Sequence, residues 1–170
     1  GPTLSDNITG FYAAYGVLAA LFERERTGQG RRIETSMLES TIAFAPDAFV
    51  NAQRYGTRID QTSRVSVSQS YAFRCRDGRL IALHLSSQPK FWEGLLAVLE
   101  RPDLAAHPDF STREQRIANY KALQAELAKT FATRERGDWE ARLEQHDVPY
   151  APVLNVDEVI RIIRQSDEPK

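Results

Sequence analysis

Residues 5–22 read SDNITGFYAAYGVLAALF, and the interpretation of the chain starts from this stretch. None of residues 8–22 is charged, so the helix expected over residues 7–26 should be apolar on nearly every side and buried. Its glycines and alanines would let neighbouring elements approach the backbone closely. Because burial against other elements supplies most helical stability, the stretch predicts a long helix that needs a partner surface.

Asp6 stands at the expected start of this helix, and two interpretations of it remain open. Aspartate is a preferred N-cap residue, and so are the types of its neighbours Ser5 and Asn7. A carboxylate near the first N–H groups and the positive end of the helix dipole could also act as a nucleophile toward an acyl carbon. The two roles are compatible, since a capping environment favours the ionised form of a carboxylate.

The composition is that of an ordinary globular protein and excludes several classes of function. The 170 residues carry a formal net charge of −1, with 42% hydrophobic and 26% charged residues. This balance gives no case for a nucleic-acid partner or for an anionic membrane surface. The single cysteine, Cys75, excludes an internal disulfide and is typical of a reducing compartment, so we expect a cytoplasmic protein. The apolar run of residues 8–22 is too short for a membrane span.

After the long helix we expect a turn, a short strand and a second helix. Gly28 is the natural left-handed C-cap, and residues 33–35 are predicted to form a strand. Residues 36–39 have the capping-box pattern and should open a helix over residues 37–54, which Pro46 would kink or break. The polar residues 56–68 are typical of a linker.

A second unit should begin near Gln69 with a β-hairpin. Residues 71–75 and 80–85 alternate in hydropathy around an Asp77-Gly78 turn. Helical spacing of apolar residues predicts a helix capped by residues 86–89, one after the capping box of residues 111–114, and helices opening at Asn119 and Thr133. An extended segment over residues 148–154 and a last helix capped by Asn155 should follow. The expected fold is therefore helix-rich α+β: a long buried helix and linker in residues 1–68, followed by a small α+β domain led by a β-hairpin in residues 69–170.

Other chemistry-bearing residues form no convincing site. His84, His107 and His146 have no ligand spacing with one another or with Cys75, so no metal site is predicted. Cys75 should be a packed small side chain, because no setting that would lower a thiol pKa is evident. The glycines of residues 27–30 follow a helix, whereas a phosphate cradle needs a helix N-terminus, so they predict a plain turn.

The run of residues 6–40 resembles the family III CoA-transferases. Their signature reads D-x-x-x-G, an alanine-rich helix, R-x-x-T-G-x-G-Q, a strand, and a helix that opens S-M-x-[DE]. The first two parts are matched here at Asp6, Gly10, Arg24, Thr27, Gly28 and Gly30. Arg31 departs from the pattern, because the family usually has Gln at that position. The similarity extends to about Ile160 and so covers most of the chain.

The resemblance implies an acyl-CoA:carboxylate CoA-transferase with Asp6 as its catalytic residue, acting through an aspartyl anhydride and an aspartyl-CoA thioester. No tightly bound cofactor is expected, and the residues that would bind CoA stay unassigned. An acyl-CoA, as a coenzyme A thioester, and a carboxylic acid would be the substrates. Residues 86–88 follow a strand at the place where the family's small domain can close over the active site.

The resemblance also implies a piece of a longer protein, without the N-terminal half that carries most CoA contacts, and an interlocked homodimer. Two alternatives stay open. In an acyl-CoA racemase, Asp6 would be a general base paired with a histidine from that N-terminal half. In a non-catalytic dimerisation or interaction fragment, a large apolar face would be exposed. The sequence does not identify the acyl group or the acid.

Overall fold

The structure, a computed structural model, describes residues 3–56 and 59–166. The chain divides into two compact units, residues 1–59 and 60–170, whereas the sequence places the boundary after residue 68. The difference comes from a short helix, α4 (Ser63–Val67), in the polar segment expected to be a linker. This helix packs against strand β1 (Ser70–Arg74) and helix α6 (Arg113–Ala118) of the second unit.

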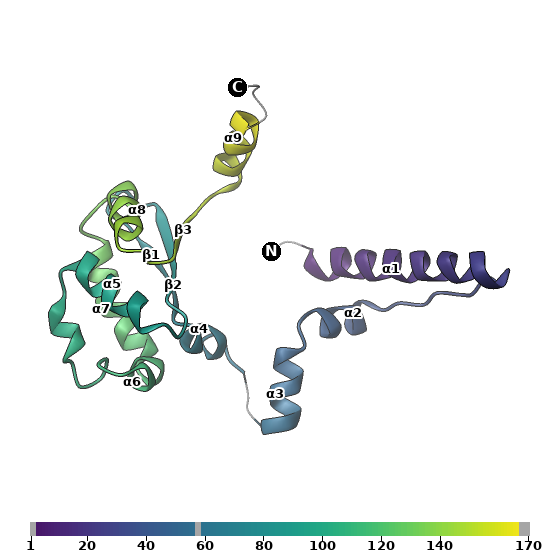
Figure 1. Cartoon of the computed structure of the whole chain (residues 1–170), viewed down its shortest axis with the longest axis horizontal. Helices are drawn as coiled ribbons and strands as arrows, with labels where there is room; N and C mark the ends of the chain where they lie inside the picture. Colours follow the sequence, from purple (N-terminus) through teal and green to yellow (C-terminus); the bar gives the residue numbers. More distant parts are fainter. Residues whose placement is uncertain (1–2, 57–58, 167–170) are drawn as a thin grey trace. The chain divides into compact units, whose positions relative to one another are not determined.

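The first unit is built from helices α1 (Leu4–Thr27), α2 (Met37–Phe44) and α3 (Asp47–Tyr55), shown in purple and blue in Figure 1. Pro46 breaks the helix predicted over residues 37–54 into α2 and α3. Ala45, the residue before the proline, leaves helical geometry at φ −125° and ψ 64°, as the proline ring requires of its neighbour. Residues 33–35 have no regular secondary structure, so the predicted strand is wrong: in the described chain they have no strand to pair with.

The long helix α1 packs against α2, as expected, but most of its apolar surface stays open. Among the described residues of the first unit, Ile8 and Ser40 are the two that are buried. Four large side chains of α1 each expose between 63% and 68% of their surface: Phe11, Tyr15, Leu18 and Phe22. The predicted burial of α1 on nearly every side is therefore not met within this chain. None of the described helices is long and apolar enough to cross a membrane.

The second unit contains a three-stranded antiparallel sheet in the order β1-β2-β3, with β2 at Leu80–His84 and β3 at Tyr150–Val153. The Asp77-Gly78 hairpin is confirmed: Gly78 has φ 79°, and Asp77 Oδ1 accepts the N–H of Arg79 at 3.2 Å. The predicted extended segment joins the sheet as β3, with Ala151 opposite Ala82.

The remaining helices are α5 (Pro89–Leu99), a 3₁₀ turn η1 (Pro102–Ala105), α6, α7 (Tyr120–Phe131), α8 (Arg136–Gln145) and α9 (Val156–Ser166). Their order is as predicted, but two starts are shifted. The capping box of α6 joins Thr112 and Gln115, one residue later than expected, and α8 has Glu135 at its N-cap instead of Thr133. Asn155 caps α9 as predicted, because its Oδ1 accepts the N–H of Glu158 at 2.9 Å.

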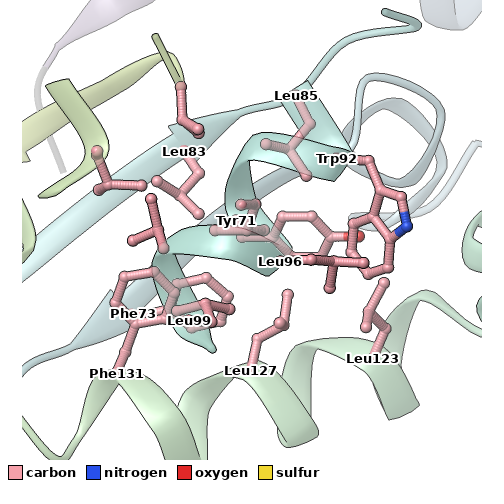
Figure 2. Close-up of a cluster of buried hydrophobic side chains, with 14 of the residues drawn as sticks. Tyr71, Phe73, Leu83, Leu85, Trp92, Leu96, Leu99, Leu123, Leu127 and Phe131 are labelled. Atoms are coloured by element: carbon pink, nitrogen blue, oxygen red, sulfur yellow. The ribbon is translucent and has the colours of Figure 1, made fainter. Parts of the chain in front are cut away.

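The core of the second unit lies between one face of the sheet and helices α5, α7 and α8 (Figure 2). Phe73 of β1 stacks on Phe131 of α7 with ring centroids 4.5 Å apart, and the indole N–H of Trp139 donates to the Phe131 carbonyl at 2.9 Å. Cys75 belongs to this core, and burial raises the pKa of its thiol. The expectation of a packed, unreactive cysteine is therefore confirmed.

A buried leucine of α7 should contribute far more to stability than an exposed isoleucine of α9. We expect Leu127→Ala, at a fully buried position, to lower the free energy of unfolding by about 2–5 kcal/mol, because it leaves a cavity. Ile162→Ala, at a position 52% exposed, should cost less than about 1 kcal/mol. Urea unfolding followed by circular dichroism measures both, and equal losses would contradict this placement of the core.

Candidate functional site

Asp6 lies inside the first turn of α1, not before it. The N-cap position is held by Thr3, whose side chain makes no capping hydrogen bond, so the interpretation of Asp6 as an N-cap is wrong. The first backbone hydrogen bond runs from the N–H of Asn7 to the carbonyl of Thr3 at 3.3 Å. A carboxylate in this turn still interacts favourably with the positive end of the helix dipole. The Asp6 side chain is exposed and has no hydrogen-bond or ion-pair partner in the part of the chain that the structure describes.

The second part of the signature forms the C-terminus of α1. Gly28 takes the left-handed conformation at φ 73°, and its N–H donates to the Arg24 carbonyl at 2.8 Å, which confirms the predicted C-cap. The Thr27 hydroxyl donates to the Glu23 carbonyl at 2.9 Å and accepts the N–H of Gln29 at 3.2 Å. These residues therefore build a turn, as the sequence predicts, and not a phosphate cradle.

After this turn the chain runs back along α1. A Cβ atom placed on Gly16 would lie 2.8 Å from Cγ2 of Ile33, so the segment after the turn can approach α1 this closely because residue 16 is glycine. A small hollow of about 170 Å³ between them is lined in part by Val17, Leu21 and Arg31. The close approach that the small residues predict is thus made by residues 30–33.

The two parts of the signature lie at opposite ends of α1. Twenty residues at 1.5 Å each separate Asp6 from Arg26 by about 30 Å, which is beyond the reach of any side chain. The arginines near the C-terminus of α1 are exposed, and some pair with glutamates, as in Arg31 with Glu23 and Arg32 with Glu34 at 2.6 Å. Arg26 lies instead over the ring of Phe22. These arginines form a solvated face, and none of them contacts Asp6 in the described chain.

Ser86, the first residue of the segment 86–88, is held by a polar network that the sequence did not predict. Ser86 has φ 53°; its N–H donates to the Ser68 carbonyl at 2.9 Å, and its carbonyl accepts from Nε2 of Gln69 at 3.0 Å. Oε1 of Gln69 in turn accepts from Nε of Arg116 at 2.8 Å. A role of this loop in closing over a substrate stays a prediction.

The three histidines lie in separate local environments. His84 is exposed at the end of β2, as expected, with Nδ1 2.9 Å from Oγ of Ser70. Nδ1 of His107 accepts the N–H of Asp109 at 3.2 Å. Among the described residues no group of three or more His, Cys, Asp or Glu side chains is arranged to hold a metal ion.

The second unit has two larger hollows that sequence reasoning missed, each of about 530 Å³. The first is mostly apolar and includes Ala72, Ala82 and Ala151, which the strand register aligns across the sheet. The second is lined by arginines from the hairpin, α8 and α9. Strand alternation could have shown that Ala72 and Ala82 share a face, but no local pattern predicts which distant segments join them.

The chain matches the family model described as CoA-transferase family III over residues 1–167. The chain belongs to this family. It is 32% identical to the succinyl-CoA:mesaconate CoA-transferase of Haloarcula marismortui, covering 94% of this chain and 39% of that protein. It is 29% identical to the acetyl-CoA:oxalate CoA-transferase of Acetobacter aceti, covering 95% of this chain and 42% of that protein. The family III chain thus spans about two fifths of the length of these curated relatives.

Solved structures share the fold of this family III chain. A CAIB/BAIF family protein from Brucella suis superimposes with a TM-score of 0.79 at 24% identity, over 95% of this chain and 43% of that one. The orthorhombic form of Rv3272 from Mycobacterium tuberculosis gives a TM-score of 0.77 at 26% identity, over 98% of this chain and 44% of that one. These likenesses support the helix-rich α+β fold described above.

Two glycines of α1 offer a matched test of the packing along this helix. Gly10→Ala should stabilise the helix by up to about 1 kcal/mol, because nothing described lies within 4 Å of the new Cβ atom. Gly16→Ala should stabilise the helix less than Gly10→Ala, or destabilise it, because Ile33 must move to make room for the new Cβ atom. Thermal unfolding of the two variants measures the difference. Adding Ile33→Ala to Gly16→Ala should remove the loss of stability that comes from the clash. An equal gain in stability in Gly10→Ala and Gly16→Ala would refute the contact between residues 16 and 33.

Proposed function

We propose that this chain is the part of an acyl-CoA:carboxylate CoA-transferase that supplies the nucleophile, and that Asp6 is that nucleophile. The observation that carries the proposal is the position of Asp6: it matches the family signature, lies in the first turn of α1, and has an exposed carboxylate without a partner among the described residues. The relatives named above as CoA-transferases act on different acids, so their names support the reaction type and leave the acid open.

The proposed reaction exchanges CoA between two carboxylates through Asp6. A carboxylate oxygen of Asp6 attacks the carbonyl carbon of the donor thioester, and the C–S bond breaks to give a mixed anhydride and a CoA thiolate. The thiolate attacks the Asp6 carbonyl and releases the donor acid, leaving an aspartyl-CoA thioester. The acceptor carboxylate then displaces the thiolate from Asp6, forming a second anhydride. Attack of the thiolate on the acceptor carbonyl yields the new acyl-CoA and restores the Asp6 carboxylate.

This sequence of steps needs protection from water, because both the anhydride and the aspartyl thioester would otherwise hydrolyse. Asp6 is exposed in this chain, so we infer that the cover comes from a second copy or from further protein. The exposed apolar residues of α1 support a second copy, and we propose a homodimer. The same exposed face would serve a non-catalytic interaction fragment, which is the alternative that the experiments below separate from the enzyme. No tightly bound cofactor is proposed.

The substitution Asp6→Asn separates a nucleophile from a residue that merely favours the helix. In the full-length enzyme, assayed with an acyl-CoA and a free acid, we expect CoA exchange to fall by roughly three orders of magnitude or more. The helix should lose less than about 1 kcal/mol, because one charge–dipole interaction is removed. Asp47→Asn is the matched control, since Asp47 occupies the first turn of α3, and it should leave the exchange rate unchanged.

Trapping with hydroxylamine distinguishes the remaining alternatives. Incubation of the wild-type enzyme with acyl-CoA and hydroxylamine should leave a hydroxamate on Asp6, detected by mass spectrometry. A racemase would give no adduct and would instead incorporate solvent deuterium at the α carbon without CoA exchange. Near-normal exchange by Asp6→Asn would refute the catalytic role and leave an interaction function.

The exposed side chains of α1 should make the chain self-associate. We expect sedimentation velocity to show dimers or larger species that grow with concentration, because a contiguous apolar face is costly to leave in water. Leu18→Lys should reduce association, whereas Asn7→Lys adds the same charge at an exposed polar position of the same helix and should not. A monodisperse monomer at high concentration would count against the dimer.

A further inference from the structure

The second of the larger hollows brings together four arginines from three separate segments of the second unit. Arg74 and Arg79 flank the hairpin turn, Arg136 begins α8, and Arg161 lies in α9. Glu158 is the acidic residue in this lining. The three segments are far apart in the sequence, so the fold itself creates this concentration of positive charge. We call it the arginine hollow.

The floor of the arginine hollow is a fixed, buried cation. The side chain of Arg136 is 10% exposed; its Nε lies 3.2 Å from Oε1 of Glu140, and its Nη2 lies 3.5 Å from Oε1 of Glu158. Nη1 donates to the Val153 carbonyl at 3.4 Å. The N–H of Asn155, together with the nearby Arg136 and Arg79, lowers the pKa of Glu158, which keeps this carboxylate ionised. The charge of Arg136 is thus largely compensated.

The charge of the rim is compensated less than that of Arg136, because Arg79 is near Glu158 but forms no ion pair with it. The side chains of Arg79 and Arg161 are exposed, and within the described chain they donate no hydrogen bond and form no ion pair. The turn holds the guanidinium of Arg74, whose Nη1 donates to the Gly78 carbonyl at 2.7 Å. Asp77 and Glu140 contact Arg136 without lining the hollow. An anion entering here would therefore meet three guanidinium groups that form no ion pair with a carboxylate in the described chain.

We propose that the arginine hollow binds a small molecule that bears a phosphate or diphosphate group. The guanidinium fork matches phosphate oxygens bidentately, and all the cations lining this hollow are arginines. Its volume, about 530 Å³, falls in the range of small-molecule sites. Two sources share this chemistry: the phosphates of a CoA thioester and a free nucleotide or inorganic phosphate. The inference does not rest on the role proposed for Asp6, because binding of a phosphate group here requires no transfer reaction.

Calorimetric titration of the full chain with inorganic pyrophosphate at low ionic strength tests the site. We expect saturable binding that weakens with added salt, and roughly tenfold weaker binding in Arg79→Gln and in Arg161→Gln, since each removes a charged donor. Neither side chain loses a hydrogen bond or an ion pair within the described chain, so both variants should unfold within a few degrees of the wild-type temperature. Arg164→Gln is the matched control, because Arg164 is an exposed arginine of the same helix outside the lining, and it should change affinity less than about twofold.

Competition then distinguishes the two sources. Displacement of pyrophosphate by coenzyme A but not by pantetheine would assign the site to the phosphates of CoA, and displacement by ADP but not by coenzyme A would assign it to a free nucleotide. Either result supports the site. The proposal is overturned by the absence of saturable binding, or by equal affinity losses in Arg161→Gln and Arg164→Gln, which would indicate diffuse charge attraction only.

Discussion

The buried guanidinium of Arg116 connects the elements on which the second unit depends. It is 5% exposed, donates from Nε to Gln69 and from Nη1 to the carbonyls of Phe110 and Ser111 at 3.0 and 3.3 Å, and lies 4.4 Å from the ring centroid of Trp92. Burying a charge is costly unless its donors are satisfied. Burial accordingly lowers the pKa of Arg116, and amide and carbonyl oxygens take the place of a carboxylate. One side chain thereby joins the start of β1 to α5 and to the turn before α6.

This connection explains why the hairpin tolerates strain at its open end. Gln69 and Ser86 both have positive φ, at 46° and 53°, which side chains with a Cβ atom adopt at a cost. They are held there by the hydrogen bonds between residues 68–69 and 85–86 and by the link to Arg116. Tyr120 adds a further bond from its hydroxyl to the Ser70 carbonyl at 2.5 Å. With the open end fixed, the closed end can project Arg74 and Arg79 at a defined place.

Local signals predicted most elements, and long-range contacts account for what they missed. Gly28, Pro46 and the Asp77-Gly78 pair act through their own backbone geometry, so the sequence alone placed the corresponding helix ends and turn. Residues 33–35 were wrongly predicted as a strand because Ile33 and Thr35 are β-favouring residue types. In the structure Ile33 packs on Gly16 of α1, and the segment pairs with no strand of the described chain. The Arg116 network and the arginine hollow depend on residues more than forty positions apart, which no local pattern brings together. The catalytic role proposed for Asp6 comes from the resemblance, and the position of Asp6 in the first turn needed the structure.

The geometry of α1 limits which parts of the substrate the first unit can contact. A CoA thioester and an acceptor acid would bring negative charge to Asp6, yet no arginine of the described chain forms a hydrogen bond or an ion pair with Asp6. Arg26, at the other end of α1, lies about 30 Å away along the helix. The first unit would therefore present the proposed nucleophile without a cation paired to it. Relatives named for mesaconate and for oxalate match this chain at 32% and 29% identity, although their acids differ. We infer that this region carries the chemistry that the family shares, and that groups outside the first unit select the acid.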